Sequence, residues 1–150
     1  MAVGPGSGKA EDAHRAQGRR PGWTPVLLLG GDVLCFLVFA ALGRNQHNEA
    51  PGVLNVVETA WPFVAGWIVV VPLRGVLAIE PGRPLVAARG VLRAWPLAWP
   101  IALVLRAGLQ RRDIPLSFDI VALLANGAFL LGWRAAFASM LGRLHTDGLP

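Results

Sequence analysis

Residues 23–43 read WTPVLLLGGDVLCFLVFAALG, a run of apolar side chains and glycines interrupted by one charged residue, Asp32. A helix of about 20 apolar residues is long enough to cross the roughly 30 Å hydrocarbon core of a bilayer. This stretch is therefore predicted to be a membrane-spanning helix. Its lone carboxylate is the first candidate for a functional group.

Three further apolar stretches follow at residues 59–79, 90–109 and 118–140. The third is the weakest, because its uninterrupted run, 94–105, has 12 residues, and runs of about 10 to 14 can also be re-entrant or buried. Arginines at the edges of a span can extend to the interface and lengthen its usable part. We expect four spans, forming an all-α bundle of a polytopic membrane protein over residues 23–142.

The composition agrees with a membrane protein. Residues of the hydrophobic types make up 54% of the chain and charged residues 15%, whereas a soluble domain has about 25% charged residues. Residues 1–22 are rich in glycine and charge and are expected to be disordered, and residues 143–150 are expected to form a second tail. The single cysteine, Cys35, permits neither an intramolecular disulfide nor a Cys-rich metal site.

The distribution of Lys and Arg between the loops predicts the orientation. One side carries ten such residues: Lys9, Arg15, Arg19, Arg20, Arg74, Arg83, Arg89, Arg93, Arg134 and Arg143. The other side carries Arg44, Arg106, Arg111 and Arg112. Because cytoplasmic loops are enriched in Lys and Arg, both termini are predicted to be cytoplasmic. Cations scattered between apolar runs do not favour nucleic-acid binding.

A cleaved signal peptide is an alternative interpretation of residues 23–43. Ala41-Leu42-Gly43 would then be the small-residue cleavage site, preceded by a basic region at Arg19 and Arg20. The apolar run is long for a signal peptide, and three more predicted spans follow it. We therefore favour a retained first span.

Asp32 and Arg134 are predicted to form an intramembrane pair. By the helical rise of about 1.5 Å per residue, Asp32 lies roughly 12 Å from the cytoplasmic start of span one, and Arg134 roughly 6 Å from the cytoplasmic end of span four. A charge at such depth normally faces the bundle interior and has a partner. The pair is either a structural link between the two spans or a functional site. If Arg134 instead reached the interface, Asp32 would be a candidate for proton relay.

A second group of polar residues is expected at the outer ends of the spans: Arg44, His47, Glu49, Glu58 and Arg106. His47 titrates near neutral pH, so a pH-sensitive gate is one interpretation. A solvated loop with weak interfacial ion pairs is the other. The spacing matches no zinc pattern, and no metal or cofactor is expected.

Trp95-Pro96-Leu97-Ala98-Trp99-Pro100 places two tryptophans and two prolines four residues apart in the third span. Pro96 and Pro100 each remove a backbone donor and are predicted to kink the helix. A broken helix can line a binding cavity, but a plain kink is the favoured interpretation.

Small residues at Ala128, Gly132 and Ala136 form a stripe along the fourth span. Such a stripe allows close helix packing, which we expect within the bundle, with a dimer as the alternative. Asn126, near mid-span, is expected to hydrogen-bond across helices. Three tryptophans near span ends are predicted to anchor the helices at the interfaces: Trp23, Trp61 and Trp133.

Several motifs together resemble one known family. They are Gly31-Asp32-Val33-Leu34, the exit from Phe39 to His47, Thr59-Ala60-Trp61-Pro62-Phe63 with Gly66-Trp67, Leu105-Arg106, Ser117-Phe118 and Leu130-Leu131-Gly132-Trp133-Arg134. Over residues 24–136 the chain resembles the domain of unknown function 3054 family, small four-helix membrane proteins found largely in actinobacteria and some archaea. The resemblance implies a bacterial plasma membrane and carries over no catalytic residue. The prolines of the third span and the long N-terminal tail depart from the family pattern.

Two functional classes remain. No nucleophile with a base, carboxylate pair or metal cage can be assembled, so an enzyme is not expected. We favour an accessory or structural protein whose partners are the bilayer and another membrane protein or a second copy. The alternative is a small carrier or proton-coupled channel that uses the Asp32 and Arg134 pair.

Overall fold

The computed structural model describes residues 22–46, 52–110 and 116–147. These ranges hold four α-helices and no strand: α2 (Thr24–Gln46), α3 (Val53–Leu73), α4 (Pro84–Gln110) and α5 (Leu116–Asp147). The predicted all-α class is confirmed. Helices α2, α3 and α5 are long and apolar enough to cross a membrane. The predicted disordered tail lies, apart from Gly22, outside the described residues.

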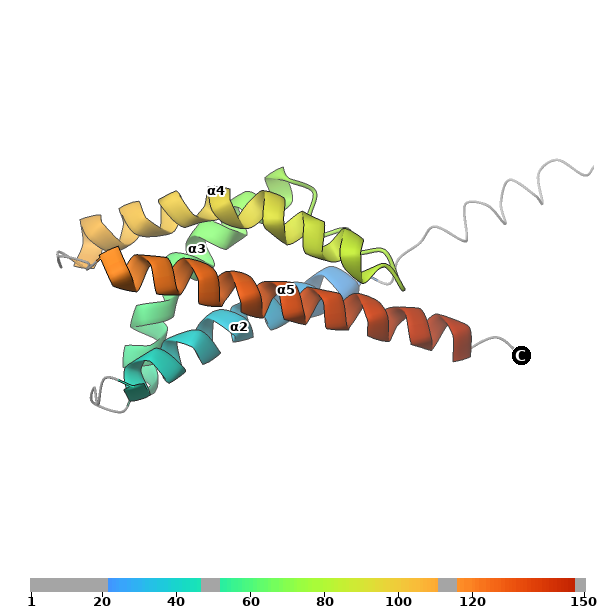
Figure 1. Ribbon diagram of the computed structural model, residues 1–150, viewed down its shortest axis with the longest axis horizontal. Coiled ribbons are helices and arrows are strands. Elements are labelled where there is room, and N and C mark those ends of the chain that lie inside the picture. Colours follow the sequence, from blue (N-terminus) through green and yellow to red (C-terminus); the bar gives the residue numbers. More distant parts are fainter. Residues whose placement is uncertain (1–21, 47–51, 111–115, 148–150) are drawn as a thin grey trace, which may run out of the picture.

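The four helices run alternately up and down and form a closed ring (Figure 1). Each helix packs against two others: α3 lies between α2 and α4, and α5 lies between α4 and α2. The start of α2, the α3–α4 connection and the end of α5 lie toward one end of the bundle, on the right in Figure 1. The last helix therefore returns to the first and completes the bundle.

The helix boundaries differ from the predicted spans, most clearly in α3, which was expected at residues 59–79. Apolar residues before Thr59 continue the helix back to Val53. At the other end, Gly75 adopts a left-handed φ of 63°. The N–H of Gly75 donates to Pro72 and that of Val76 to Val71, which is the Schellman pattern that ends helices.

The remaining helices are longer than their predicted spans. Helix α4 begins at Pro84 rather than residue 90, because proline is well suited to the first turn of a helix, where its missing N–H costs nothing. Helix α5 continues to Asp147, across the predicted boundary at residue 142. The segment 143–147 is therefore helical where a tail was expected.

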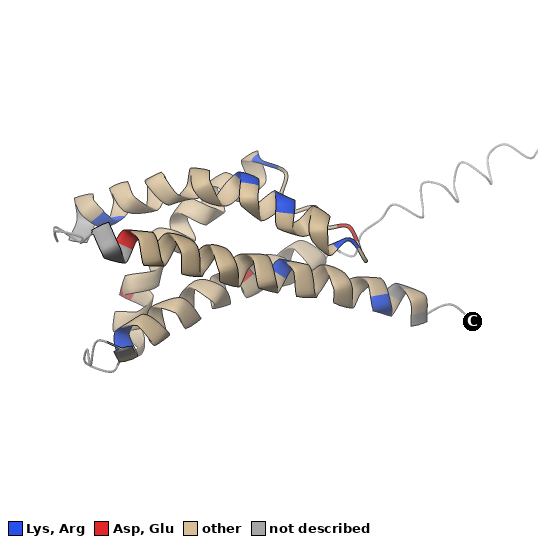
Figure 2. Ribbon diagram, viewed as in Figure 1, with Lys and Arg blue, Asp and Glu red and all other residues tan. Residues whose placement is uncertain are grey.

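The interior of the bundle contains two apolar clusters. The larger is dominated by aromatic rings with centroid separations of 5.6 to 6.5 Å, contributed by Phe36, Phe39, Phe63, Trp67, Trp95 and Trp99. The smaller contains Leu28, Ile79, Ala87, Phe137, Ala138 and Leu141. Figure 2 shows that many charged residues lie near helix ends, with one acidic position in the middle of α2 and one basic position in the middle of α5.

Candidate functional site

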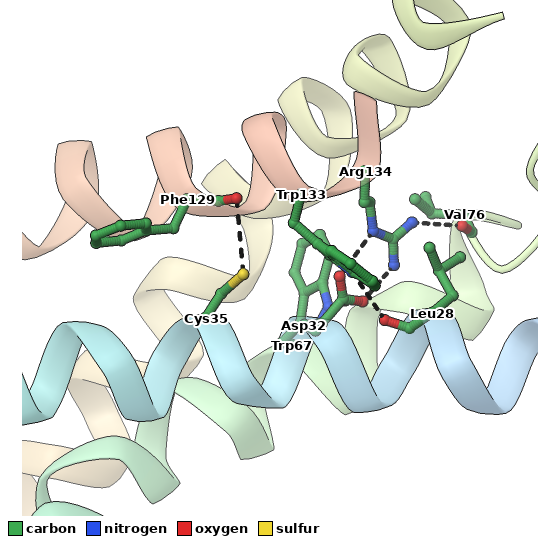
Figure 3. A network of polar contacts seen from close by, with 8 residues as sticks. All are labelled: Leu28, Asp32, Cys35, Trp67, Val76, Phe129, Trp133 and Arg134. Carbon is green, nitrogen blue, oxygen red and sulfur yellow. Dashed lines mark hydrogen bonds and ion pairs between the residues drawn. The ribbon is translucent and has the colours of Figure 1, made fainter. Parts of the chain in front are cut away.

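Asp32 of α2 and Arg134 of α5 are in direct contact inside the bundle (Figure 3). The Arg134 Nε donates to Asp32 Oδ1 at 3.0 Å, and the Arg134 Nη2 donates to Asp32 Oδ2 at 2.5 Å. This is the two-pronged geometry in which a guanidinium matches a carboxylate. The structure thus brings together the two residues that the depth argument placed at similar levels.

A tryptophan and a backbone carbonyl complete the set of contacts. The Trp67 indole Nε1 donates to Asp32 Oδ2 at 2.9 Å, and the Arg134 guanidinium carbon lies 5.2 Å from the centre of the Trp67 ring. The third guanidinium nitrogen, Nη1, donates to the carbonyl of Val76 at 2.6 Å. Every nitrogen of the guanidinium therefore has an acceptor.

The end of α3 explains why the Val76 carbonyl accepts this hydrogen bond. Because the Schellman turn at Gly75 ends the helix, Val76 lies beyond the last helical residue. Its carbonyl points toward Arg134 rather than along a continuing helix (Figure 3). One left-handed glycine thus helps to position an acceptor for a buried cation.

The Asp32 and Arg134 pair is withdrawn from solvent. The exposed fraction is 0% for Asp32 and 1% for Arg134. Two charges buried in this way are favourable only when geometry and additional hydrogen bonds offset their lost hydration. Asp32 accepts three hydrogen bonds and the Arg134 guanidinium donates three, which meets that requirement. The arrangement is therefore a buried and internally satisfied ion pair.

Trp133, the neighbour of Arg134, also points into the bundle. Its Nε1 donates to the carbonyl of Leu28 at 3.3 Å (Figure 3). A Cβ added at Gly31 would collide with the Trp133 ring, so the glycine leaves the space that the indole occupies. Trp133 therefore links α2 and α5, and its anchoring at the membrane interface stays a prediction.

The predicted outer group is described only in part. Arg44, Glu58 and Arg106 lie on helices whose ends meet at the end of the bundle opposite the α3–α4 connection, whereas His47 and Glu49 lie outside the described residues. The guanidinium carbon of Arg106 lies 6.0 Å from the centre of the Phe63 ring. Asp119, at the start of α5, is close enough to Arg106 for their charges to interact.

The two prolines of α4 lie on its exposed face, and the helix continues unbroken through both. The inward face instead carries Trp95, whose Nε1 donates to the carbonyl of Leu123 in α5 at 2.8 Å. Pro96 and Pro100 therefore do not line a cavity inside the bundle. Figure 1 shows that α4 follows an arched path.

The predicted packing residues of α5 are divided between two faces. Ala128, Gly132 and Ala136 are exposed, and no atom lies within 4 Å of a Cβ added at Gly132, so the expectation that this stripe packs within the bundle is corrected. Asn126 is buried, but its Nδ2 donates to Ala122 of its own helix at 2.9 Å. The hydrogen bond expected across helices is therefore replaced by one within α5.

Trp67 and Val76 are the two members of the site that the sequence did not reveal. An indole N–H placed in the middle of a membrane span requires an acceptor, because no water is available there. That argument could have pointed from Trp67 to the nearest intramembrane carboxylate, Asp32. No sequence signal identified the Val76 carbonyl, since it depends on where α3 ends.

Residues 29–137 match the model of a protein family described as protein of unknown function, DUF3054. The match covers the polar site and parts of all four helices. No curated protein and no solved structure matches the chain. Among the described residues, no three His, Cys, Asp or Glu side chains are grouped so that they could hold a metal ion.

Proposed function

The chain belongs to the DUF3054 family, and we propose that it is an accessory protein of the bacterial plasma membrane that supports or binds other membrane proteins and transports no solute. It crosses the membrane four times and has both termini in the cytoplasm. Its partners are the bilayer and a second membrane protein or another copy of the chain. It catalyses no reaction and uses no cofactor.

The ring of helices supports a fourth crossing by α4, the helix with the shortest apolar run. Helix α3 ends, and α4 begins, at the end of the bundle where α2 also begins. Helix α5 begins at the opposite end. If α3 and α5 both cross, α4 must cross between them. Its 27 residues extend about 40 Å at the usual helical rise.

The orientation follows from the basic residues at that shared end. Arg74 and Arg83 lie in or beside the α3–α4 connection, and Arg89 lies in the first turns of α4. Enrichment of Lys and Arg on the cytoplasmic side supports an inward position for this end. Most residues in the apolar parts of α2, α3 and α5 lie outside the bundle interior, which suits contact with lipid or with a partner helix.

The buried ion pair is the observation that carries the accessory role. A carboxylate that relays protons across a membrane must exchange them with water on one side and then on the other. Asp32 has no exposed surface, and both of its carboxylate oxygens accept hydrogen bonds. The pair therefore suits a fixed link between α2 and α5. A carrier that uses Asp32 would have to break the three hydrogen bonds that Asp32 accepts in each cycle.

The experiment is a proton-flux measurement in proteoliposomes under an imposed membrane potential. The purified wild type is compared with Asp32→Asn and with protein-free vesicles, using a pH-sensitive dye. We expect the folded wild type to give no flux above that of the empty vesicles. A wild-type flux that Asp32→Asn abolishes would overturn the accessory role in favour of the carrier.

A further inference from the structure

A pocket of about 460 Å3 opens between the end of α3, the α3–α4 connection, the first half of α4 and Arg134 of α5. This volume lies within the range of small-molecule binding sites, about 300 to 1,000 Å3. Four arginines line the pocket: Arg74, Arg89, Arg93 and Arg134. None of its lining residues is acidic. The pocket is therefore strongly basic.

The local structure brings these arginines together. Arg89 and Arg93 are four residues apart in α4 and therefore share one helical face. Arg74 follows the last residue of α3, immediately before the left-handed turn at Gly75. Arg134 reaches the pocket from the opposite wall while it remains bound to Asp32. Two connected helices and a third helix thus contribute cations to one cavity.

Three of the four charges are uncompensated. Within the described ranges, Arg74, Arg89 and Arg93 form no ion pair and are exposed, whereas Arg134 is neutralised by Asp32. The one other ion pair in this region, between Arg83 and Glu80 at 2.8 Å, includes no residue that lines the pocket. Three unpaired arginines that line one pocket favour an anion with several oxygens, because arginine forms paired hydrogen bonds with phosphate.

The rest of the pocket wall is aliphatic. Leu73 and Val86 are exposed at its rim, and Val76 and Ile79 are buried in its wall. Arginines beside exposed aliphatic residues at the end of a membrane bundle suit a ligand with a charged phosphate next to an apolar part. Basic pockets between membrane helices on the cytoplasmic side bind the headgroups of anionic lipids by the same chemistry.

We propose that this arginine pocket binds a phosphate-bearing anion. The ligand is either the headgroup of an anionic phospholipid of the inner leaflet or a soluble phosphate. In both cases Arg74, Arg89 and Arg93 contact the phosphate oxygens. Arg134 forms part of the pocket wall and stays paired with Asp32. The proposal does not depend on the accessory role, because a carrier could contain the same site.

Native mass spectrometry of the full chain in a neutral detergent tests this proposal. The wild type is titrated with phosphatidylglycerol, with phosphatidylcholine as the zwitterionic control, and in a separate arm with inorganic phosphate. The charge variant is Arg89→Gln with Arg93→Gln. Its matched control is Arg83→Gln with Arg143→Gln, which removes two exposed arginines that do not line the pocket.

We expect the wild type to prefer phosphatidylglycerol, and the charge variant to lose about tenfold or more in affinity, since each lost charged hydrogen bond is worth at least that factor. The control variant should retain its affinity to within about twofold. Ala78→Phe, at an exposed position of the pocket wall, should also reduce binding, because it fills the cavity and keeps every arginine. If the charge variant fails to fold, Ala78→Phe provides the same test.

The lipid titration and the inorganic phosphate titration distinguish a lipid headgroup from a soluble phosphate as the ligand. Binding of phosphatidylglycerol that inorganic phosphate does not displace identifies a lipid site. Binding of inorganic phosphate that the charge variant abolishes, without a preference among lipids, identifies a site for a soluble phosphate. Equal losses in the charge variant and its control, or no binding of either probe, would overturn the proposal.

Discussion

The guanidinium of Arg134 lies edge-on to the carboxylate of Asp32, with two parallel hydrogen bonds of 3.0 and 2.5 Å joining α5 to α2. The remaining nitrogen is bound to Val76 at 2.6 Å, so the side chain cannot rotate without losing an acceptor. The pair thus fixes both the distance between the two helices and their relative height. Predictions about stability follow from this geometry.

Removal of one charge of the Asp32 and Arg134 pair should lower the free energy of unfolding more than removal of both charges. We expect Asp32→Asn to lower the free energy of unfolding by about 3 to 5 kcal/mol, because it leaves Arg134 buried without its counter-charge. The double variant Asp32→Leu with Arg134→Leu should be more stable than Asp32→Asn. Denaturant titration in micelles, monitored by tryptophan fluorescence, measures the free energy of unfolding of both variants. A double variant less stable than the single one would contradict a buried ion pair of this kind.

Trp67→Phe should weaken the same site through one lost hydrogen bond. The phenyl ring keeps much of the packing but leaves Asp32 Oδ2 without the indole donor, at an expected cost of about 1 to 3 kcal/mol. Trp99→Phe is the matched control, since Trp99 makes ring contacts but no side-chain hydrogen bond within the described parts of the chain. The two variants are compared by thermal unfolding in the same detergent. Equal losses would mean that ring size, and not the hydrogen bond, accounts for the effect of Trp67.

Replacement by alanine should have different effects on stability at two adjacent glycines of α2. Gly31→Ala places a methyl group against the ring of Trp133, so we expect a clear loss of stability. Gly30→Ala meets no atom within 4 Å and should be neutral or slightly stabilising, because alanine favours a helix over glycine by about 1 kcal/mol. The melting temperatures of both variants check this contrast. A melting temperature of Gly31→Ala equal to that of the wild type would show that Trp133 does not occupy the space beside Gly31.

The proposed fourth crossing predicts opposite accessibility for the two ends of α4. In a Cys35→Ala background, Gly108→Cys should react with a membrane-impermeant maleimide added outside intact cells. Arg83→Cys should react only after permeabilisation. Both positions are exposed, so access from one side of the membrane decides the reaction. Labelling of both positions from the same side would mean that α4 does not cross.

The pairing of Asp32 with Arg134 was predictable because depth in a membrane follows from residue count at a fixed rise per residue. Trp67 was overlooked because its position within the aromatic sequence of α3 gave no indication of a partner in α2. The end of α3 was misplaced by six residues, since apolar residues continue past Gly75 to Ile79. A hydropathy profile does not reveal that Gly75 adopts a left-handed conformation, and this conformation determines where Val76 lies.

Arg74, Arg89 and Arg93 were counted correctly in the sequence but interpreted only as signs of orientation. Arg89 and Arg93 share a helical face, a relationship visible from their spacing. Their convergence with Arg74 was not visible, because it depends on the tight turn that follows α3. In the same way, the small residues of α5 follow a regular spacing, yet nothing in that spacing reveals that their face is exposed.

The two partners of the ion pair are 102 residues apart, one in the first helix described and one in the last. In the proposed membrane arrangement, Asp32 enters the bilayer before the ribosome reaches Arg134, so for that interval the carboxylate is without this counter-charge. A chain that stops before α5 never acquires one. We expect such fragments to be recognised and degraded, so that the ion pair marks the completion of biogenesis as well as the position of two helices.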